Sequence, residues 1–348
     1  MHVVHHQSPL HLRLFHHDQL PGLVPALRAQ GDRDNITRGG AASRSSPTHR
    51  HTSFATTSPP MISQGRLSAV IESPMDRWEE ILSDAITPAV RELRSRPELE
   101  ALFWGRFNKP TWQIQLCVFG PAGWVDGFVR PLLDRRLAPL RESGRARAIA
   151  FGPYEPEMEP CGGEVGMRLT ERISHHDSLA CLDLMEAEAK GRLARSRREF
   201  SLVMVERLLD QLRFDRRMRL GFYERGYRWA FSMGSMKPED LKVLDRKYEE
   251  LRPGLLALLE GEASRNESSQ WGGADPARIA KECLRATGPI IEETMAAHAA
   301  GRLSQDLVNL AWFWTGMHSN RLGIVNVSEA VLRYYMHRLY RDGEIGAP

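Results

Sequence analysis

The stretch from Tyr154 to Gly163 separates two parts of the chain that differ in sequence periodicity, and this constrains the fold more than any other feature. Pro156 and Pro160 keep the stretch extended, because each proline fixes φ and lacks an N–H donor. The pair Gly162-Gly163 then permits the positive φ that a sharp turn into a helix requires. Before this corner the pattern predicts alternating strands and helices, and after it the pattern predicts helices.

The first part, residues 61–160, predicts a small antiparallel sheet with helices. Strands are expected at 67–72, 102–107, 112–119 and 147–151, and helices at 76–94 and 124–141. The order β-α-β-β-α-β is that of a ferredoxin-like sheet with two helices on one face. In the third strand Gln113 and Gln115 share one face, because strand side chains alternate between faces.

The second part, residues 161–345, predicts a largely α-helical half. Apolar stripes with helical spacing indicate helices at about 164–173, 177–190, 197–213, 216–230, 238–260, 276–300, 303–320 and 328–341. Asp177 and Ser178 are interpreted as a helix start, because short oxygen-bearing side chains satisfy the unpaired N–H groups of a first turn. The predicted fold class is therefore α+β, with both halves in a single domain over 61–345.

Composition limits the function classes. Hydrophobic residues make up 42% and charged residues 26% of the 348 residues, as in soluble globular proteins. A net charge of +3 without a dense basic stripe argues against a nucleic-acid partner. No apolar run reaches the ~18 residues that span a bilayer. The four cysteines lack metal-site spacing. We therefore expect a cytoplasmic protein without a metal or cofactor and without a membrane partner.

Residues 1–60 differ from the rest of the chain. They contain eight of the thirteen histidines and many Ser, Thr, Gly and Pro residues, with little apolar periodicity. Such a segment cannot bury enough apolar surface to offset its ordering entropy. We interpret it as a disordered extension, or as the result of a misassigned start, because Met61 or Met75 would serve equally well.

Three motifs carry a family resemblance. The segment Tyr154–Gly163 resembles the signature Tyr-Glu-x-Glu-x-x-Arg-Tyr-Gly-Gly of the C-terminal elimination domain of lantibiotic dehydratases. The segment Ser174–Ser178 resembles the Phe-His-x-Asp-Ser motif that follows it. The segment Met317–Leu322, which reads Met-His-Ser-Asn-Arg-Leu, resembles the last motif of the same family. The resemblance covers residues 65–345.

The chain departs from the elimination enzymes where they carry arginine. Their third strand reads His-Leu-Arg-Leu-Arg, and the matching segment Gln113–Cys117 contains no arginine. Pro160 and Cys161 replace the arginine and tyrosine of the signature, and Gly316 replaces the first histidine of a His-Met-His run. Arginines suit elimination of a glutamyl ester, because the guanidinium binds the departing carboxylate bidentately. The scaffold is kept while these residues are lost.

This combination resembles the thiopeptide pyridine synthases. The resemblance implies a formal [4+2] aza-cycloaddition between two dehydroalanines of a modified precursor peptide. Loss of water and of the leader peptide then gives the pyridine core of a macrocycle. The implied partner is the precursor peptide, with its leader and its azole- and dehydroalanine-containing core, and other enzymes of the pathway are further candidate partners. Two alternatives stay open: a stand-alone glutamate-eliminating lyase, and a non-catalytic scaffold that binds the leader.

The resemblance and the expected chemistry select the candidate site residues. The candidate catalytic residues, with His318 as general acid or base, are His318, Tyr154, Glu155, Glu157 and Tyr223. The candidate substrate-binding residues are Gln113, Gln115, Tyr227, Asn320 and Arg321. Tyr223 and Tyr227 are included because they form an i, i+4 pair on one helix face.

Overall fold

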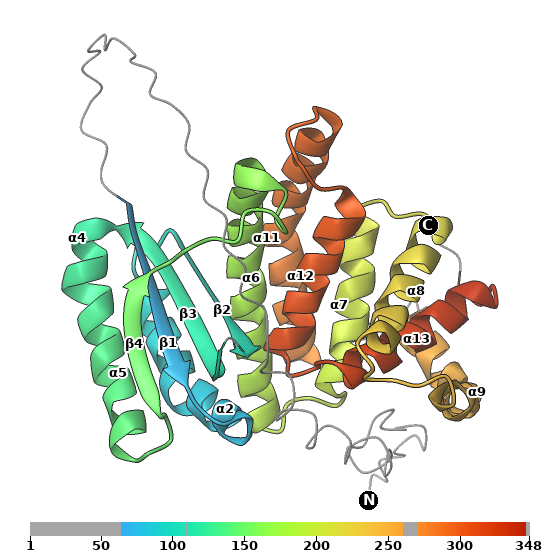
Figure 1. Ribbon diagram of the computed structural model, residues 1–348, viewed down its shortest axis with the longest axis horizontal. Coiled ribbons are helices and arrows are strands. Elements are labelled where there is room, and N and C mark those ends of the chain that lie inside the picture. Colours follow the sequence, from blue (N-terminus) through green and yellow to red (C-terminus); the bar gives the residue numbers. More distant parts are fainter. Residues whose placement is uncertain (1–63, 109, 260–270, 346–348) are drawn as a thin grey trace, which may run out of the picture. The chain divides into compact units, whose positions relative to one another are not determined.

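The first half forms a four-stranded antiparallel sheet with strand order β2-β3-β1-β4 (Figure 1). The computed structural model describes residues 64–108, 110–259 and 271–345, and the predicted extension over 1–60 lies outside them. The strands are β1 (Gln64–Glu72), β2 (Ala101–Asn108), β3 (Trp112–Pro121) and β4 (Ala148–Pro153). This order and the antiparallel pairing are those of a ferredoxin-like sheet, so the predicted topology is confirmed.

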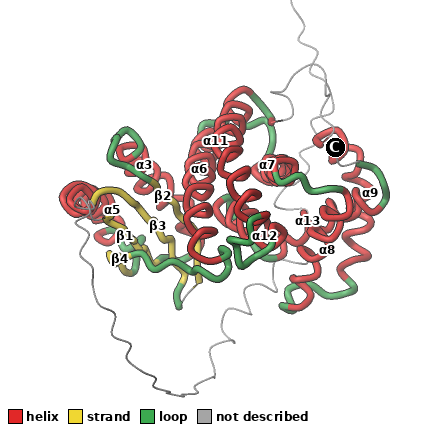
Figure 2. The backbone as a smooth tube through the Cα atoms, turned by 90° about the horizontal axis from the view of Figure 1, so that it is seen from above, coloured by secondary structure: helices red, strands yellow, loops and turns green. Residues whose placement is uncertain are grey.

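Two interrupted helices cover one face of the sheet. The first comprises α2 (Trp78–Ile81), a π-helical turn (Leu82–Ile86) and α3 (Thr87–Leu93). The second comprises α4 (Ala122–Trp124), a π-helical turn (Val125–Val129) and α5 (Arg130–Glu142). Figure 2 shows α3 and α5 beside the strands. Alternate residues of β3 are fully buried in the core that these helices cover, namely Ile114, Leu116 and Val118.

The second half is helical, as predicted. Its helices are α6 (Gly163–Ala189), α7 (Arg197–Gln211), α8 (Arg216–Ser232), α9 (Asp240–Leu259), α11 (Ala274–Ala299), α12 (Leu307–Arg321) and α13 (Val327–Arg341). Helix α6 runs beside the edge strand β2 and packs against α11 on its other side (Figure 1). The two helices expected at 164–173 and 177–190 are therefore one continuous helix, which lines the boundary between the halves.

A buried polar cluster joins α7, α8 and α13. Arg219 Nη1 donates to Glu206 Oε2 at 2.7 Å, and Arg219 Nη2 donates to Asp210 Oδ1 at 2.6 Å. The hydroxyls of Tyr223 and Tyr340 both donate to the Glu206 carboxylate. Because every member has a partner, the cluster satisfies its buried charges and fixes how the three helices pack.

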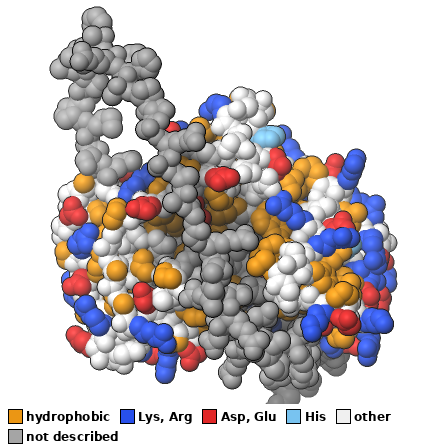
Figure 3. Space-filling view, in the orientation of Figure 1, with side chains coloured by type: hydrophobic (Ala, Val, Ile, Leu, Met, Phe, Trp, Pro, Cys, Tyr) orange, Lys and Arg blue, Asp and Glu red, His pale blue; other side chains and the backbone are white. Residues whose placement is uncertain are grey.

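The described surface carries mixed charge. On the face drawn in Figure 3, basic side chains are interspersed with acidic ones. None of the helices within the described ranges is long and apolar enough to cross a membrane.

Trp271, which lies beside a polar segment of the sequence, is 9% exposed and packs against Phe200 with 5.4 Å between ring centroids. Its side chain therefore belongs to the core of the helical half.

Candidate active site

A pocket of about 160 Å³ opens on the sheet face that the α2–α5 segments leave uncovered. Its floor consists mainly of alternate residues of β2 and β3, because strand side chains point to opposite faces in turn, and Trp104 of β2 also borders it. Gln113 and Gln115 line the pocket and lie opposite Phe107 and Gly105 in the strand register. Ile114, between the two glutamines, is fully buried on the opposite face. The predicted shared face of Gln113 and Gln115 is confirmed.

Helices α6 and α12 form the walls of the pocket. Apart from the adjacent pair Thr170 and Glu171, their lining residues lie three or four positions apart, which places each set on one helix face. From α6 these are Met167, Thr170, Glu171 and Ser174, and from α12 they are Phe313, Met317 and Arg321. Apolar side chains therefore line the walls together with a few polar groups, as is usual in small-molecule pockets.

The arm that follows β4 closes one end of the pocket. Tyr154, Glu155, Glu157 and Cys161 line it. The ring of Tyr154 packs edge-on against Phe103, with 5.4 Å between ring centroids, which anchors the arm to the sheet. The arm residues predicted for the site therefore share one pocket with the two glutamines of the floor.

The corner after the arm depends on glycine. Gly162 and Gly163 have φ values of 83° and 84°, so the predicted positive φ is confirmed. A Cβ on Gly166 would lie 1.8 Å from the carbonyl oxygen of Cys161, so only glycine fits this position. The Ser304 N–H donates to the Gly162 carbonyl at 3.1 Å, which ties the corner to the segment before α12. The arm is thus held at both ends.

Burial shifts the pKa of most titratable groups in the pocket. Burial raises the pKa of Glu171, against the attraction of Arg66, whose Nη1 donates to Glu171 Oε1 at 2.8 Å. Burial raises the pKa of Cys117 to about 12 and that of Cys161 to about 11. It also raises the pKa of Tyr154. Both thiols and the phenol therefore stay protonated near pH 7, so neither of the two cysteines described in the pocket is a thiolate nucleophile.

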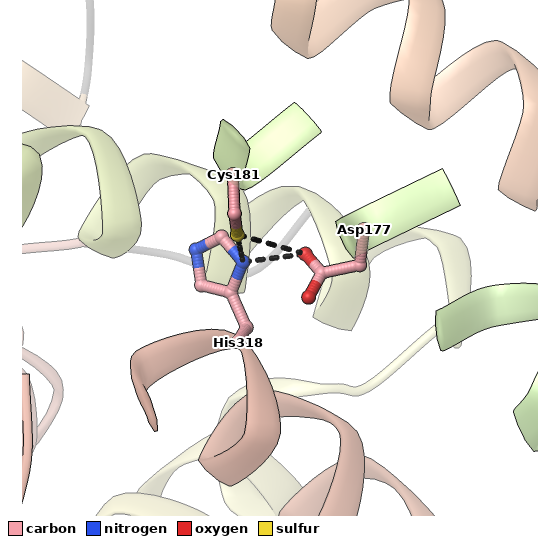
Figure 4. Close-up of side chains that lie close together, drawn as sticks. All are labelled: Asp177, Cys181 and His318. Atoms are coloured by element: carbon pink, nitrogen blue, oxygen red, sulfur yellow. Dashed lines mark hydrogen bonds and ion pairs between the residues drawn. The ribbon is translucent and has the colours of Figure 1, made fainter. Parts of the chain in front are cut away.

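His318 lies outside the pocket. Its Nδ1 is 2.6 Å from Asp177 Oδ1 (Figure 4), and Arg321 Nη1 donates to Asp177 Oδ2 at 2.6 Å. Burial alone would raise the pKa of Asp177, but the positive charges and hydrogen bonds of His318 and Arg321 outweigh it and lower this pKa to about 2. Among the described residues, His318 Nε2 finds no hydrogen-bond partner, and His318 borders a second cavity of about 40 Å³ between α6, α7, α11 and α12.

Asp177, Cys181 and His318 form the group of potential metal ligands found among the described residues, with ligand atoms within 4.8 Å of one another (Figure 4). Arg321 already bonds the second carboxylate oxygen of Asp177, and its guanidinium opposes a cation at this place. Burial raises the pKa of the Cys181 thiol well above its usual value, which disfavours the thiolate that metals bind. The group suits a hydrogen-bonded ion pair better than a metal ion.

Side chains from α6 and α12 seal the free edge of β2. Ser178 Oγ accepts from the Trp104 N–H at 3.2 Å, and Arg321 Nε donates to the Trp104 carbonyl at 2.8 Å. Asn320 Oδ1 accepts from the Arg106 N–H at 2.9 Å, and Asn320 Nδ2 donates to the Arg106 carbonyl at 2.8 Å. An edge strand otherwise exposes unpaired backbone groups. Asn320, a predicted substrate contact, bonds this strand but does not line the pocket. Arg321, also a predicted substrate contact, bonds the strand and lines the pocket.

The interpretation of Asp177 and Ser178 as a helix start is wrong. Helix α6 continues through both residues, and both are buried. Short oxygen-bearing side chains favour helix starts, but they equally satisfy buried partners from other elements. His175, another residue of this motif, belongs to the same edge seal, since its Nδ1 accepts from the Leu102 N–H at 3.1 Å. Burial lowers the pKa of His175 to about 4, so the imidazole is a neutral acceptor.

Tyr223 and Tyr227 lie in the core of the helical half and do not line the pocket. Tyr223 belongs to the buried cluster around Glu206. The ring of Tyr227 packs against Tyr334 and His337, with centroid separations of 5.2 and 5.1 Å. The structure therefore does not bring this i, i+4 pair to the residues of the arm and the floor.

Glu171 is a pocket residue that the sequence analysis missed. It is 6% exposed and lies on the stripe Met167, Glu171, Ser174 and Ser178, whose spacing of four, three and four marks one face of α6. Carboxylates are seldom so deeply buried without a partner or a role. A glutamate on the buried stripe of a long helix was the available signal.

Residues 67–340 match the family described as lantibiotic biosynthesis dehydratase C-term. Among solved structures, the chain is similar to the tRNA-dependent lantibiotic dehydratase MibB from Microbispora sp. 107891, with 16% identity and a TM-score of 0.57. The match covers 83% of this chain but only 29% of MibB, so this chain spans less than a third of that protein.

Two smaller proteins match over nearly their whole length. TsrL is 17% identical, with a TM-score of 0.56, and the match covers 82% of this chain and 97% of TsrL. The pyridine synthase TbtD from thiomuracin biosynthesis is 15% identical, with a TM-score of 0.57, and the match covers 80% of this chain and 98% of TbtD. At these identities the likeness shows a shared fold. A comparison with curated proteins finds no match.

Proposed function

The chain belongs to the family of lantibiotic biosynthesis dehydratase C-terminal domains, and from this premise we propose that it is a pyridine synthase. Its substrate is a modified precursor peptide that carries two dehydroalanines, azole rings and a leader. Its product is a pyridine-centred macrocycle, formed with release of water and of the leader as a carboxamide. The match to TbtD over 98% of that protein's length supports this proposal.

The observation that carries the proposal is the neutral floor of the pocket. The elimination enzymes that the chain resembles place arginines on this strand, and here the pocket-facing residues are Gln113 and Gln115. The described residues that line the pocket include one arginine, Arg321. Its charge is already neutralised by the buried carboxylate of Asp177. Such a pocket lacks a clamp for a departing glutamate carboxylate. A cycloaddition between two alkenes expels no such group.

The pocket supplies what a cycloaddition requires. The amide of one dehydroalanine tautomerises to its iminol, and the resulting aza-diene forms two ring bonds with the second alkene. Holding two distant alkenes in a near-attack geometry can contribute roughly 7–11 kcal/mol. Gln115 Nε2 donates to Ser68 Oγ at 2.7 Å, which orients its amide toward a ligand on the floor. Phe103 and Phe107 offer aromatic surface to flat rings.

The reaction is redox-neutral as written. The cycloadduct first loses its hydroxyl and a ring hydrogen as water. The leader then leaves as a carboxamide, with a second ring hydrogen, and the ring becomes aromatic. Every proton that leaves one atom is taken up by another within the same sequence of steps. The demands on the protein are therefore binding, orientation and proton transfer, which polar groups in a partly apolar pocket can meet.

Mass spectrometry of a synthetic peptide tests the proposal. The peptide carries a leader, azoles and two dehydroalanines, and it is incubated with the purified chain. We expect a product lighter by one water plus the leader carboxamide, with new pyridine absorbance. A peptide with one dehydroalanine replaced by alanine should stay unchanged. If the substrate is untouched while a glutamylated precursor loses glutamate, the chain is an eliminating lyase. If neither reacts but the leader binds, it is a scaffold.

A further inference from the structure

We propose that Glu171 is the general acid–base group of the pocket and that it removes the water from the cycloadduct. This assignment rests on the proposed function. It adds a residue, from a different element, to the set that sequence motifs had suggested. It also assigns proton transfer to Glu171 in place of His318, because His318 does not line the pocket and is bonded to Asp177.

The geometry of Glu171 fits this role. Its side chain lines the pocket from the middle of the α6 wall. Arg66 Nη1 holds Oε1 at 2.8 Å, with the arginine side chain 34% exposed and the glutamate side chain 8% exposed. Within the described residues, Oε2 has no hydrogen bond, and it is not among the fully enclosed polar atoms without a partner. One oxygen is thus anchored, while the other is accessible from the pocket.

The surroundings of Glu171 tune it toward acid–base chemistry. Burial favours its neutral carboxyl form, while the charges of Arg66 and Arg168 favour the carboxylate. The other titratable groups that interact with it across the pocket are neutral near pH 7, namely Tyr154, Cys161 and Cys117. A carboxyl group whose pKa is raised in this way can donate a proton and then accept one within a single reaction.

The proposed step balances with this one group. Glu171 begins protonated, and its proton goes to the ring hydroxyl as the C–O bond breaks, which releases water. The carboxylate then accepts a proton from the ring methylene beside the C=N bond. The C–H electron pair forms a ring C=C bond as the C=N bond shifts to the carbon that lost the hydroxyl. Glu171 ends as it began, so the dehydration requires no co-reactant.

The variant Glu171→Gln tests the step, with Arg66→Gln as its matched control. Both variants remove the same ion pair, but only the first removes the carboxyl group. In the wild type we expect the rate of pyridine formation to fall as pH rises through the pKa of Glu171. Glu171→Gln should be slower by ~10²–10⁴-fold and should lose this alkaline limb. A hydroxylated cycloadduct should accumulate. It has the same mass as the substrate, but it no longer adds thiols, because both dehydroalanines have been consumed.

Arg66→Gln should shift the alkaline limb to higher pH, because Arg66 lowers the pKa of Glu171, and any fall in its maximal rate should be smaller than that of Glu171→Gln, which lacks the carboxyl group. A Glu171→Gln variant with the wild-type rate and pH profile overturns the proposal. Equal losses in both variants without a shift also overturn it, since the ion pair would then matter only for structure. If Glu171→Gln does not fold, the presence or absence of the Arg66→Gln shift decides.

The same experiment separates this inference from the proposed function. A wild type that makes no pyridine from the dehydroalanine peptide refutes the proposed function and the step with it. A wild type that makes pyridine, beside an equally active Glu171→Gln variant, refutes the step alone.

Discussion

Replacing Asp177 with asparagine should destabilise the fold more than any change on the surface of the same helix. Asp177 is the counter-ion of Arg321, whose side chain is 2% exposed and also bonds the edge strand β2. Removing one partner of a buried ion pair leaves an uncompensated charge and typically costs ~3–5 kcal/mol. We expect Asp177→Asn to lower the free energy of unfolding by that amount at pH 7, as measured by urea denaturation with far-UV circular dichroism.

The pH dependence gives a second measure of the same interaction. The pKa of Asp177 falls from 3.8 to about 2 on folding, and at 1.36 kcal/mol per unit this corresponds to about 2 kcal/mol. Because the folded-state pKa is the lower one, this stabilisation is present above pH 4 and is lost as pH falls toward 2. The stability gap between wild type and Asp177→Asn should therefore narrow, by up to about 2 kcal/mol, between pH 4 and pH 2.

A matched control lies on the same helix. Asp183 pairs with Arg94 at 2.9 Å, but their side chains are 27% and 45% exposed. Exposed pairs are worth ~0–1 kcal/mol, so Asp183→Asn should change stability by no more than that. If Asp177→Asn and Asp183→Asn cost the same within 1 kcal/mol, Asp177 is not a buried counter-ion, and the account of the edge seal fails.

Three further changes follow from the described contacts. His318→Ala should lower the free energy of unfolding by ~1–3 kcal/mol, because it removes a buried hydrogen bond to Asp177. Its turnover per folded molecule should change less than ~10-fold. A larger loss of rate in a stopped-flow assay would show that His318 takes part in the reaction. Gln115→Arg should lower kcat/KM for pyridine formation at least ~10-fold, because it puts a cation into the neutral floor, and a wild-type value would argue against the importance of that floor. Gly166→Ala should cost more than ~3 kcal/mol or prevent folding, whereas Gly221→Ala, in open space on α8, should be neutral or stabilising by up to ~1 kcal/mol in thermal denaturation.

Local patterns predicted the sheet half and one side of the pocket. The alternation in Gln113–Cys117 placed both glutamines on one face, because a strand has a period of two wherever it lies. The glycine pair at the corner was predicted to have positive φ for an equally local reason. Such inferences need no knowledge of which element packs against which.

The misplaced residues depend on partners far away in the chain. Asp177 bonds Arg321, 144 residues away, and Ser178 bonds Trp104, 74 residues away. Nothing in the local sequence distinguishes these side chains from helix caps, since the same oxygen atoms serve both purposes. Tyr223 was grouped with the site for its spacing alone, and its position follows from the Glu206 carboxylate on another helix.

The family motifs contain two kinds of residue, and the difference bears on how function diverges on this scaffold. Ser178, Asn320 and the Nε of Arg321 bond the backbone of β2, so any member that keeps this sheet edge has reason to keep them, whatever reaction it performs. Within the described part of the chain, the side chains of Gln113 and Gln115 form no hydrogen bond to α6 or α12, and they face the pocket instead. Substituting them changes the charge of the pocket without breaking the edge seal. The presence of these motifs therefore indicates the fold. The type of reaction should be inferred from the residues on the pocket-facing side of β3.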